Sequence, residues 1–270
     1  MATGIVELLV SHDHAVIMRS RSQASGDDAM ARIEANLARL VAKEKITEAQ
    51  AKQRRDAITF TTELSDLGQC NLVIESIIEH AATKHDLLSE LSDFLSDDAI
   101  IASNTSTLPI IDLAVASKRP QRFIGMHFFN PAPLMATVEV VPAITTDEDV
   151  IDTVVALARS LGKDPVVVKD QAGFIVNALL FPYLNEAIKL HDNGVASKEA
   201  IDSAMKGGCG FPMGPFALLD LVGLDTSLAI MDALYAEHKH PQYAASPRLR
   251  RMVSAGLLGR KTGQGFYTYG

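Results

Sequence analysis

Short apolar runs alternate with amphipathic stretches over roughly the first two thirds of the chain, and this alternation restricts the fold more than any other feature. The runs that indicate strands are 15–18, 57–60, 71–75 (NLVIE), 99–102 (AIIA) and 123–126 (FIGM), with further pieces at 137–141 and 165–168. Continuous apolar runs are typical of strands that are buried on both faces of a parallel sheet. The pattern therefore predicts a doubly wound α/β domain.

The stretches between these runs have helical spacing. Residues 3–10 place their apolar side chains on one face, and the longest amphipathic stretch, 28–45, follows a polar loop at 19–27. Thr47 has the position of a cap for a short helix that runs to Arg55. Helices and strands that follow one another in this way form a series of βαβ units.

The pattern changes near residue 170. From Gly173 onward the sequence shows helical stretches and turns with almost no strand pattern, and Ser197 has the position of a helix cap. We therefore expect two domains. The first is an α/β domain over residues 1–171, and the second is an all-helical C-terminal domain over residues 172–270.

Charge and cysteine content argue against several classes of function. The net charge of −8 disfavours nonspecific binding to nucleic acid. No run of 18 apolar residues is present, so no membrane-spanning segment is expected. The two cysteines, Cys70 and Cys209, have no metal-ligand spacing. They predict neither a metal site nor a disulfide framework, as suits a reducing cytoplasm.

Polar residues gather where the expected strands end. Ser103–Ser106 (SNTS) come directly after one strand, His127 comes directly after the next, and Glu139 lies on a neighbouring strand. Ligands of open α/β sheets bind at the carboxyl ends of strands. A histidine beside a carboxylate is a base held in one tautomer, and a hydroxyl can hydrogen-bond a substrate oxygen. This set suits removal of a proton from an alcohol as a hydride leaves. A purely structural role for His127 is the alternative.

Six motifs together make the chain similar to a known family. They are SNTS, GMHFFNPAP, VEVV, KDQAGFIVNALLFPYLNEA, GGCGFPMGPFALLDLVGLD and LGRKTGQGFYTY. In this order and spacing they resemble the 3-hydroxyacyl-CoA dehydrogenase family over essentially the whole chain, at the length of its 3-hydroxybutyryl-CoA members. The resemblance implies a Rossmann-type domain that binds NAD(P), followed by a helical domain. It also implies reversible oxidation of (S)-3-hydroxyacyl-CoA, of short chain, to 3-ketoacyl-CoA.

The resemblance assigns a catalytic role to four residues. His127 is the general base, and Glu139 orients it and stabilises the imidazolium. Ser106 hydrogen-bonds the 3-oxygen of the substrate, and Asn177 positions substrate and intermediate. Structural alternatives exist for three of them. Ser106 could cap a helix that starts at Thr107, Glu139 could pair with any cation, and Asn177 could support packing between the domains.

The resemblance also implies which residues contact NAD(P) and CoA. The cofactor contacts that it implies are Ser106, Glu79, Lys84, Asn130 and Lys261, and the CoA contacts are Ser106, Asn36 and Lys43. Arg39, Lys43 and Lys45 form a basic helix end in an acidic protein, which suits a phosphate-rich ligand. The alternative for Lys43 is an exposed helix residue in solvent.

The N-terminus departs from the family pattern. Relatives begin with an apolar strand and GxGxMG, whereas here Met1 stands at the methionine of that motif and Ala2 at its third glycine. About 25 residues, the length of a strand plus a loop, have no counterpart. Without the glycine turn, the pyrophosphate loses a backbone contact. We expect a start assigned too late, a truncated and weakened protein, or a compensating rearrangement.

A second departure concerns the adenosine ribose. The family's NAD-type pattern has an acidic residue after the second strand, whereas here Ser20 stands at that position and Arg21 follows it. A small residue followed by arginine can accept a 2′-phosphate. We therefore expect a preference for NADP over NAD. The alternative is a solvated loop.

The helical domain carries apolar residues on more than one side. They include Leu179, Leu180, Leu184, Ile188, Leu218, Leu219, Leu221, Val222 and Leu224. Broad apolar faces often mark association, and the resemblance supports a homodimer. The alternative is one self-contained helical core.

Two other functions compete with that of a dehydrogenase. They are a catalytically impaired homologue that binds acyl-CoA or pairs with an intact paralogue, and a related hydroxyacid dehydrogenase on the same fold.

Overall fold

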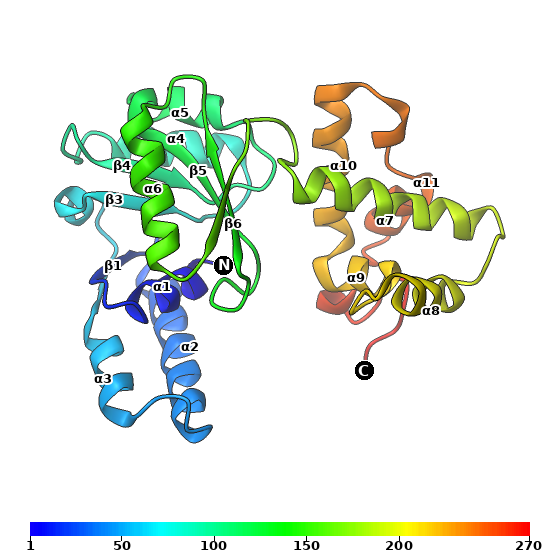
Figure 1. Cartoon of the computed structure of the whole chain (residues 1–270), viewed down its shortest axis with the longest axis horizontal. Coiled ribbons are helices and arrows are strands. Elements are labelled where there is room, and N and C mark those ends of the chain that lie inside the picture. Colours follow the sequence, from blue (N-terminus) through cyan, green and yellow to red (C-terminus); the bar gives the residue numbers. More distant parts are fainter. The chain divides into compact units, whose positions relative to one another are not determined.

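The seven strands of the protein lie in two sheets (Figure 1). The computed structural model describes residues 1–270, which divide into two units, Met1–Asp170 and Gln171–Gly270, and each unit is described by itself. The smaller sheet pairs β1 (Val16–Arg19) with β2 (Ile58–Thr61) in parallel. The larger has the order β3-β4-β5-β6-β7, with β3 at Leu72–Glu75, β4 at Ile100–Ser103, β5 at Phe123–Phe128, β6 at Thr137–Pro142 and β7 at Asp164–Val167. Every expected strand is present, which confirms the α/β prediction.

The larger sheet is mixed, so the expectation of an all-parallel sheet is wrong at one pair. Strand β6 runs antiparallel to β5, whereas its other neighbour, β7, is parallel to it. The reason is the connection. Residues 129–136 contain no helix, and a parallel neighbour needs a crossover of a dozen or more residues.

Strands β1 and β3 each pair on one side only, β1 with β2 and β3 with β4. The two sheets are therefore not hydrogen-bonded to each other. The helix α1 (Ala2–Val10) nevertheless packs on the larger sheet, because Ile5 and Leu8 belong to the same buried cluster as β5 and β6.

The remaining helices of the first unit follow the expected order. They are α2 (Gln23–Ala42), α3 (Glu48–Asp56), α4 (Ala81–Leu91), α5 (Ile110–Ala116) and α6 (Glu148–Ser160). Thr47 caps α3, as its position predicted, and the structure adds a capping box with Gln50. Helix α2 begins at Gln23, five residues before the predicted start, because the Ser22 hydroxyl caps it by accepting from the Ser25 N–H. Most of the predicted loop at 19–27 is therefore helix.

The second unit is helical. Its helices are α7 (Val176–Asp192), α8 (Lys198–Cys209), α9 (Pro215–Val222), α10 (Leu224–His238) and α11 (Pro247–Ser254). A buried cluster that includes Phe181, Leu184, Phe216 and Leu234 joins them. None of the helices in the protein has both the length and the apolar character needed to span a membrane.

Candidate active site

The centre of the candidate site is a histidine–carboxylate pair on adjacent strands. His127 lies inside β5, not after it as the apolar run suggested, and Glu139 lies directly opposite it on β6. Residues directly opposite one another on antiparallel strands project from the same face. Both side chains are buried, and His127 Nδ1 lies 2.7 Å from Glu139 Oε2. The strand register therefore sets the orientation of the imidazole.

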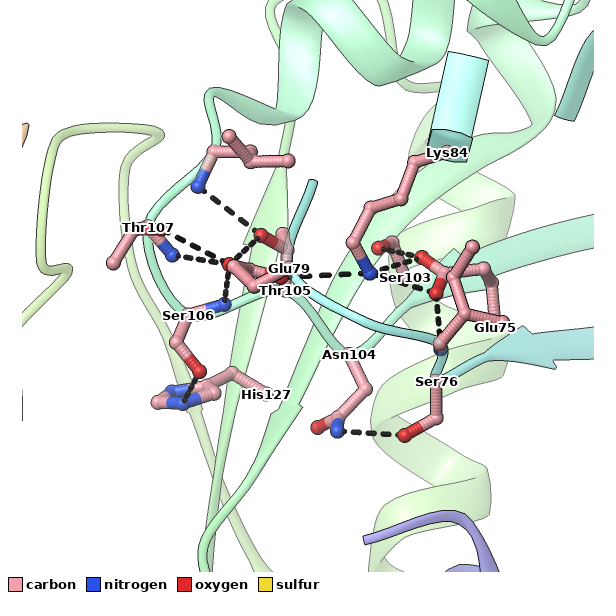
Figure 2. Close-up of polar contacts among 12 residues, drawn as sticks. Glu75, Ser76, Glu79, Lys84, Ser103, Asn104, Thr105, Ser106, Thr107 and His127 are labelled. Atoms are coloured by element: carbon pink, nitrogen blue, oxygen red, sulfur yellow. Dashed lines mark hydrogen bonds and ion pairs between the residues drawn. The ribbon is translucent and has the colours of Figure 1, made fainter. Parts of the chain in front are cut away.

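Ser106 completes a line of three groups. It follows β4 in a loop, and its Oγ lies 3.1 Å from His127 Nε2 (Figure 2). Glu139 contacts the other ring nitrogen, Nδ1. Helix α5 begins only at Ile110, with Pro109 at its N-cap position, so the interpretation of Ser106 as a helix cap is wrong. Its hydroxyl is oriented toward the histidine instead.

Glu79 holds the loop that carries Ser106. Its Oε1 accepts from the backbone N–H of Ser106 at 2.8 Å and of Thr107 at 2.9 Å, and from the Thr105 hydroxyl at 2.6 Å. Burial by itself raises the pKa of Glu79. The hydrogen bond from Thr105, the charge of Lys84 and the backbone hydrogen bonds from Ser106 and Thr107 together outweigh burial and leave the pKa below its ordinary value. Glu79 is therefore an ionised group that fixes the serine loop.

The burial of Lys84 disagrees with the prediction that it contacts the cofactor directly. Its side chain is 0% exposed and lies between Glu75, at 2.7 Å, and Glu79, at 3.4 Å. A group without exposed surface cannot touch a ligand in this conformation. Glu75 has no predicted role, although the sequence carries one signal for it, because a charged residue at the end of the apolar run NLVIE is unusual.

Asn104 connects two strand ends. Its Nδ2 donates to the Ser76 Oγ at 3.1 Å after β3, and its Oδ1 accepts from the Phe128 N–H at 2.8 Å in β5. Because Phe128 follows His127, the amide helps to fix the histidine backbone. The signal in the sequence was the polar SNTS cluster directly after an apolar strand.

The residues predicted for the adenosine end and for CoA lie around β1 and α2. Ser20 follows β1, and Arg21 is exposed beside it. The Asn36 amide is already engaged, because its Nδ2 donates to Glu7 Oε1 at 2.7 Å. Burial raises the pKa of Glu7, against the hydrogen bond from Asn36. Lys43 is exposed at the end of α2.

The other three predicted residues are divided between the two units. Asn130 is exposed in the segment after β5. Asn177 is the second residue of α7 and is buried. Lys261 is held by Asp225, with its Nζ 2.5 Å from one carboxylate oxygen. No group of histidine, cysteine, aspartate and glutamate side chains that could hold a metal ion occurs in the structure.

Two family models match nearly all of the chain. Residues 1–171 match the model of the 3-hydroxyacyl-CoA dehydrogenase NAD binding domain, and residues 173–269 match the model of the C-terminal domain of the same enzymes.

Curated relatives and solved structures cover the whole chain. A 3-hydroxybutyryl-CoA dehydrogenase of Clostridioides difficile is 45% identical over 269 residues, which are 100% of this chain and 96% of the relative. The mitochondrial hydroxyacyl-coenzyme A dehydrogenase of Sus scrofa is 42% identical, over 100% of this chain and 88% of its own. The crystal structure of (S)-3-hydroxybutyryl-CoA dehydrogenase from Ralstonia eutropha superposes with a TM-score of 0.97 at 42% identity, covering 100% of this chain and 95% of that one.

The match to the Clostridioides difficile protein also corrects the estimated number of residues without a counterpart in this chain. Only 4% of the Clostridioides difficile protein lies outside the match, which is too little for the about 25 residues without counterpart that the motif comparison suggested.

Proposed function

The chain belongs to the 3-hydroxyacyl-CoA dehydrogenase family, and on this premise we propose how its residues carry out the reaction. The protein is an NAD-dependent oxidoreductase that interconverts 3-hydroxyacyl-CoA and 3-ketoacyl-CoA. The observation that supports our assignment of roles is the line Ser106–His127–Glu139, with 3.1 Å and 2.7 Å between neighbouring polar atoms.

His127 is the proposed general base. During oxidation, Nε2 takes the proton of the substrate 3-hydroxyl, while Nδ1–H donates to Glu139, which stabilises the imidazolium that forms. Ser106 donates its hydroxyl hydrogen to the 3-oxygen. When bound, NAD supplies the acceptor for the hydride that leaves C3. In the reverse direction, the imidazolium returns its proton to the oxygen of the ketone.

The donor set of the first unit fits the cofactor at two places. The partly exposed Glu79 carboxylate suits ribose hydroxyls, and the exposed Arg21 guanidinium suits a phosphate. Asn130, Asn177 and Lys261 are proposed ligand contacts on their motifs alone. Lys84 acts through Glu79 in this proposal.

Acetoacetyl-CoA-dependent oxidation of NADH and NADPH by the purified 270-residue chain tests the reaction. Turnover is the expected result, and it supports a short-chain 3-ketoacyl-CoA as substrate. Folded protein that binds acetoacetyl-CoA without turnover would favour a binding role. Turnover of a free 3-ketoacid as fast as that of its CoA thioester would favour a hydroxyacid dehydrogenase.

We propose that the protein accepts NAD(H), as its family does, but prefers NADPH, because β1 is followed by Ser20 and Arg21 instead of a carboxylate. Arg21→Ala is expected to raise the KM for NADPH about 10-fold or more, since a charge-assisted phosphate contact contributes about 1.5–3 kcal/mol. The KM for NADH should change by less than about twofold. Steady-state kinetics with both cofactors make the measurement, and an unchanged ratio of the two KM values would contradict the proposal.

We propose a homodimer formed through the helical unit. Leu179 on α7 is 72% exposed, and Leu190 on the same helix and Ile175 at its N-cap are also exposed apolar residues. Leu179→Asp is expected to shift the protein from dimer to monomer at micromolar concentration, because an unpaired charge would be buried in the interface. Sedimentation velocity measures the shift. Val115→Asp, at a 63% exposed apolar residue of the first unit, is the matched control and should leave the dimer intact.

We propose Lys43 as a CoA contact, and Asn36 as a CoA contact only after a change of hydrogen-bond partner. Lys43, exposed at the basic end of α2, suits a phosphate of CoA. Asn36 can reach a ligand only if it exchanges its hydrogen bond to Glu7.

A further inference from the structure

Glu75 is a buried carboxylate without a role in the reaction described so far. It ends β3 and is 4% exposed. Both of its oxygens contact Lys84 Nζ, at 2.7 and 2.9 Å, and it also accepts from the Ser103 hydroxyl at 2.6 Å and from the Ile77 N–H at 2.6 Å (Figure 2). A carboxylate that accepts four contacts from three donor groups is fully satisfied as an anion. These contacts indicate that Glu75 fixes the position of a neighbouring group.

The group that Glu75 holds most directly is the Lys84 ammonium. A fully buried cation is stable only when it is paired and hydrogen-bonded. Two of the contacts of Lys84 go to Glu75, and a longer one, 3.4 Å, goes to Glu79. Glu75 therefore keeps the ammonium at a distance from Glu79 that leaves the other Glu79 oxygen free to accept from the serine loop.

The contacts continue from Glu79 to the reacting groups. Glu79 Oε1 accepts from the Ser106 N–H, and Ser106 Oγ lies 3.1 Å from His127 Nε2. Figure 2 shows these groups as one connected set, from Glu75 at one end to His127 at the other. We propose that Glu75 and Lys84 are positioning residues of the dehydrogenase, which set the place of the Ser106 hydroxyl through Glu79. The proposal rests on the roles of Ser106 and His127 given above.

The physical consequence of removing the Glu75 charge follows from this geometry. In Glu75→Gln, the amide oxygen can accept from only part of the former donor set, and the buried ammonium keeps a single anion, Glu79. The Lys84–Glu79 contact should then shorten and draw the Glu79 carboxylate away from the Ser106 N–H. A displacement of a positioned catalytic group by about 1 Å can cost about 100-fold in rate.

The experiment is a double-mutant cycle between Glu75 and Ser106. Glu75→Gln is expected to lower kcat about 10- to 100-fold while the KM for the cofactor changes by less than about twofold. Ser106→Ala should lower kcat by a similar factor. The double variant should be no slower than the slower single variant, because the same hydroxyl is lost or misplaced in each.

Three results would overturn the proposal. In the first, the losses multiply in the double variant, which would show that Glu75 acts independently of Ser106. In the second, the cofactor KM rises while kcat is unchanged, which would make the Glu75–Lys84 pair part of the cofactor site. In the third, Glu75→Gln has full activity although Ser106→Ala is impaired. Full activity of both Ser106→Ala and a His127 variant would instead overturn the proposed function itself.

Two further variants separate positioning from loss of folding. Ser117→Ala removes a fully buried hydroxyl of the same unit that donates to the Ala114 carbonyl, outside this set of contacts. It should lower stability without changing kcat. If Glu75→Gln does not fold, Glu75→Gln combined with Lys84→Met removes both charges together, which avoids an unpaired buried ion. When Ser106→Ala is added to this charge-free variant, kcat is again expected to fall no further than in the slower of the two parents.

Discussion

Replacing His127 by glutamine is expected to lower kcat for acetoacetyl-CoA reduction by a factor of about 10²–10⁴, the usual contribution of a positioned general acid or base. Glutamine can keep a hydrogen bond to Glu139 or to Ser106, but it cannot exchange a proton near neutral pH. The strand register and the buried carboxylate stay in place. The lost rate should therefore reflect the proton transfer and not a rearranged site.

Steady-state kinetics with both substrates make this measurement, and the KM for acetoacetyl-CoA should change much less than kcat. His240→Gln is the matched control, because His240 is exposed in the second unit, and it should have the kcat of the parent. A kcat of His127→Gln within about tenfold of the parent would contradict the assignment of His127 as the general base.

Asp220→Asn is expected to destabilise the helical unit by about 3 kcal/mol. Asp220 on α9 is 1% exposed and accepts from the N–H groups of Phe266 and Tyr267, both at 2.8 Å, and from the Tyr269 hydroxyl at 3.0 Å. An asparagine would turn its NH₂ group toward one of these donors. Hydrogen bonds to a buried charge contribute about 1.5–3 kcal/mol, and an unsatisfied buried donor costs a further 1–3 kcal/mol, each to order of magnitude.

Urea unfolding followed by tyrosine fluorescence measures this effect in the full chain. The protein has no tryptophan, and its five tyrosines, the earliest at 183, all lie in the second unit, so the signal reports that unit alone. Asp232→Asn is the matched control. Asp232 forms an exposed ion pair with Arg250 in the same unit, so its loss should cost less than about 1 kcal/mol. An equal shift of the midpoint in both variants would contradict the prediction.

Asp220 also explains two glycines of the C-terminal motif, one through its backbone and one through its carboxylate. A Cβ on Gly259 would lie 2.4 Å from the Asp220 carbonyl oxygen, and one on Gly265 would lie 2.1 Å from an Asp220 carboxylate oxygen. The terminal segment can therefore approach α9 only without side chains at these positions. Lys261, one of the predicted cofactor contacts, lies between them, so the hydrogen bonds of Asp220 also fix the backbone near that residue.

The features that the sequence predicted well are those that depend on neighbours along the chain. Apolar runs such as 99–102 and 123–126 have too few polar groups for the surface, and they form the buried strands β4 and β5. Thr47 and Gln50 form their capping box from residues three apart. The roles of Ser106, His127 and Glu139 stay predictions, and the structure brings their side chains into contact.

The features that the sequence did not predict depend on contacts between different elements of the fold. Lys84 is a helix residue whose charge suggests exposure, yet its burial is decided by Glu75 and Glu79, which lie on a different strand and loop. The antiparallel direction of β6 follows from a short connection and from the ladder that it forms with β5. That ladder also places Glu139 opposite His127.

By itself, the sequence determined the strands, the helices, the two-part organisation and the family, because hydrophobic period, capping and motif spacing are local properties of the chain. Only the tertiary structure decided which charges are buried together and which polar atoms meet. A hydrogen bond such as that between Ser106 and His127 joins the loop after β4 to strand β5, and its length depends on the register and packing of the whole sheet.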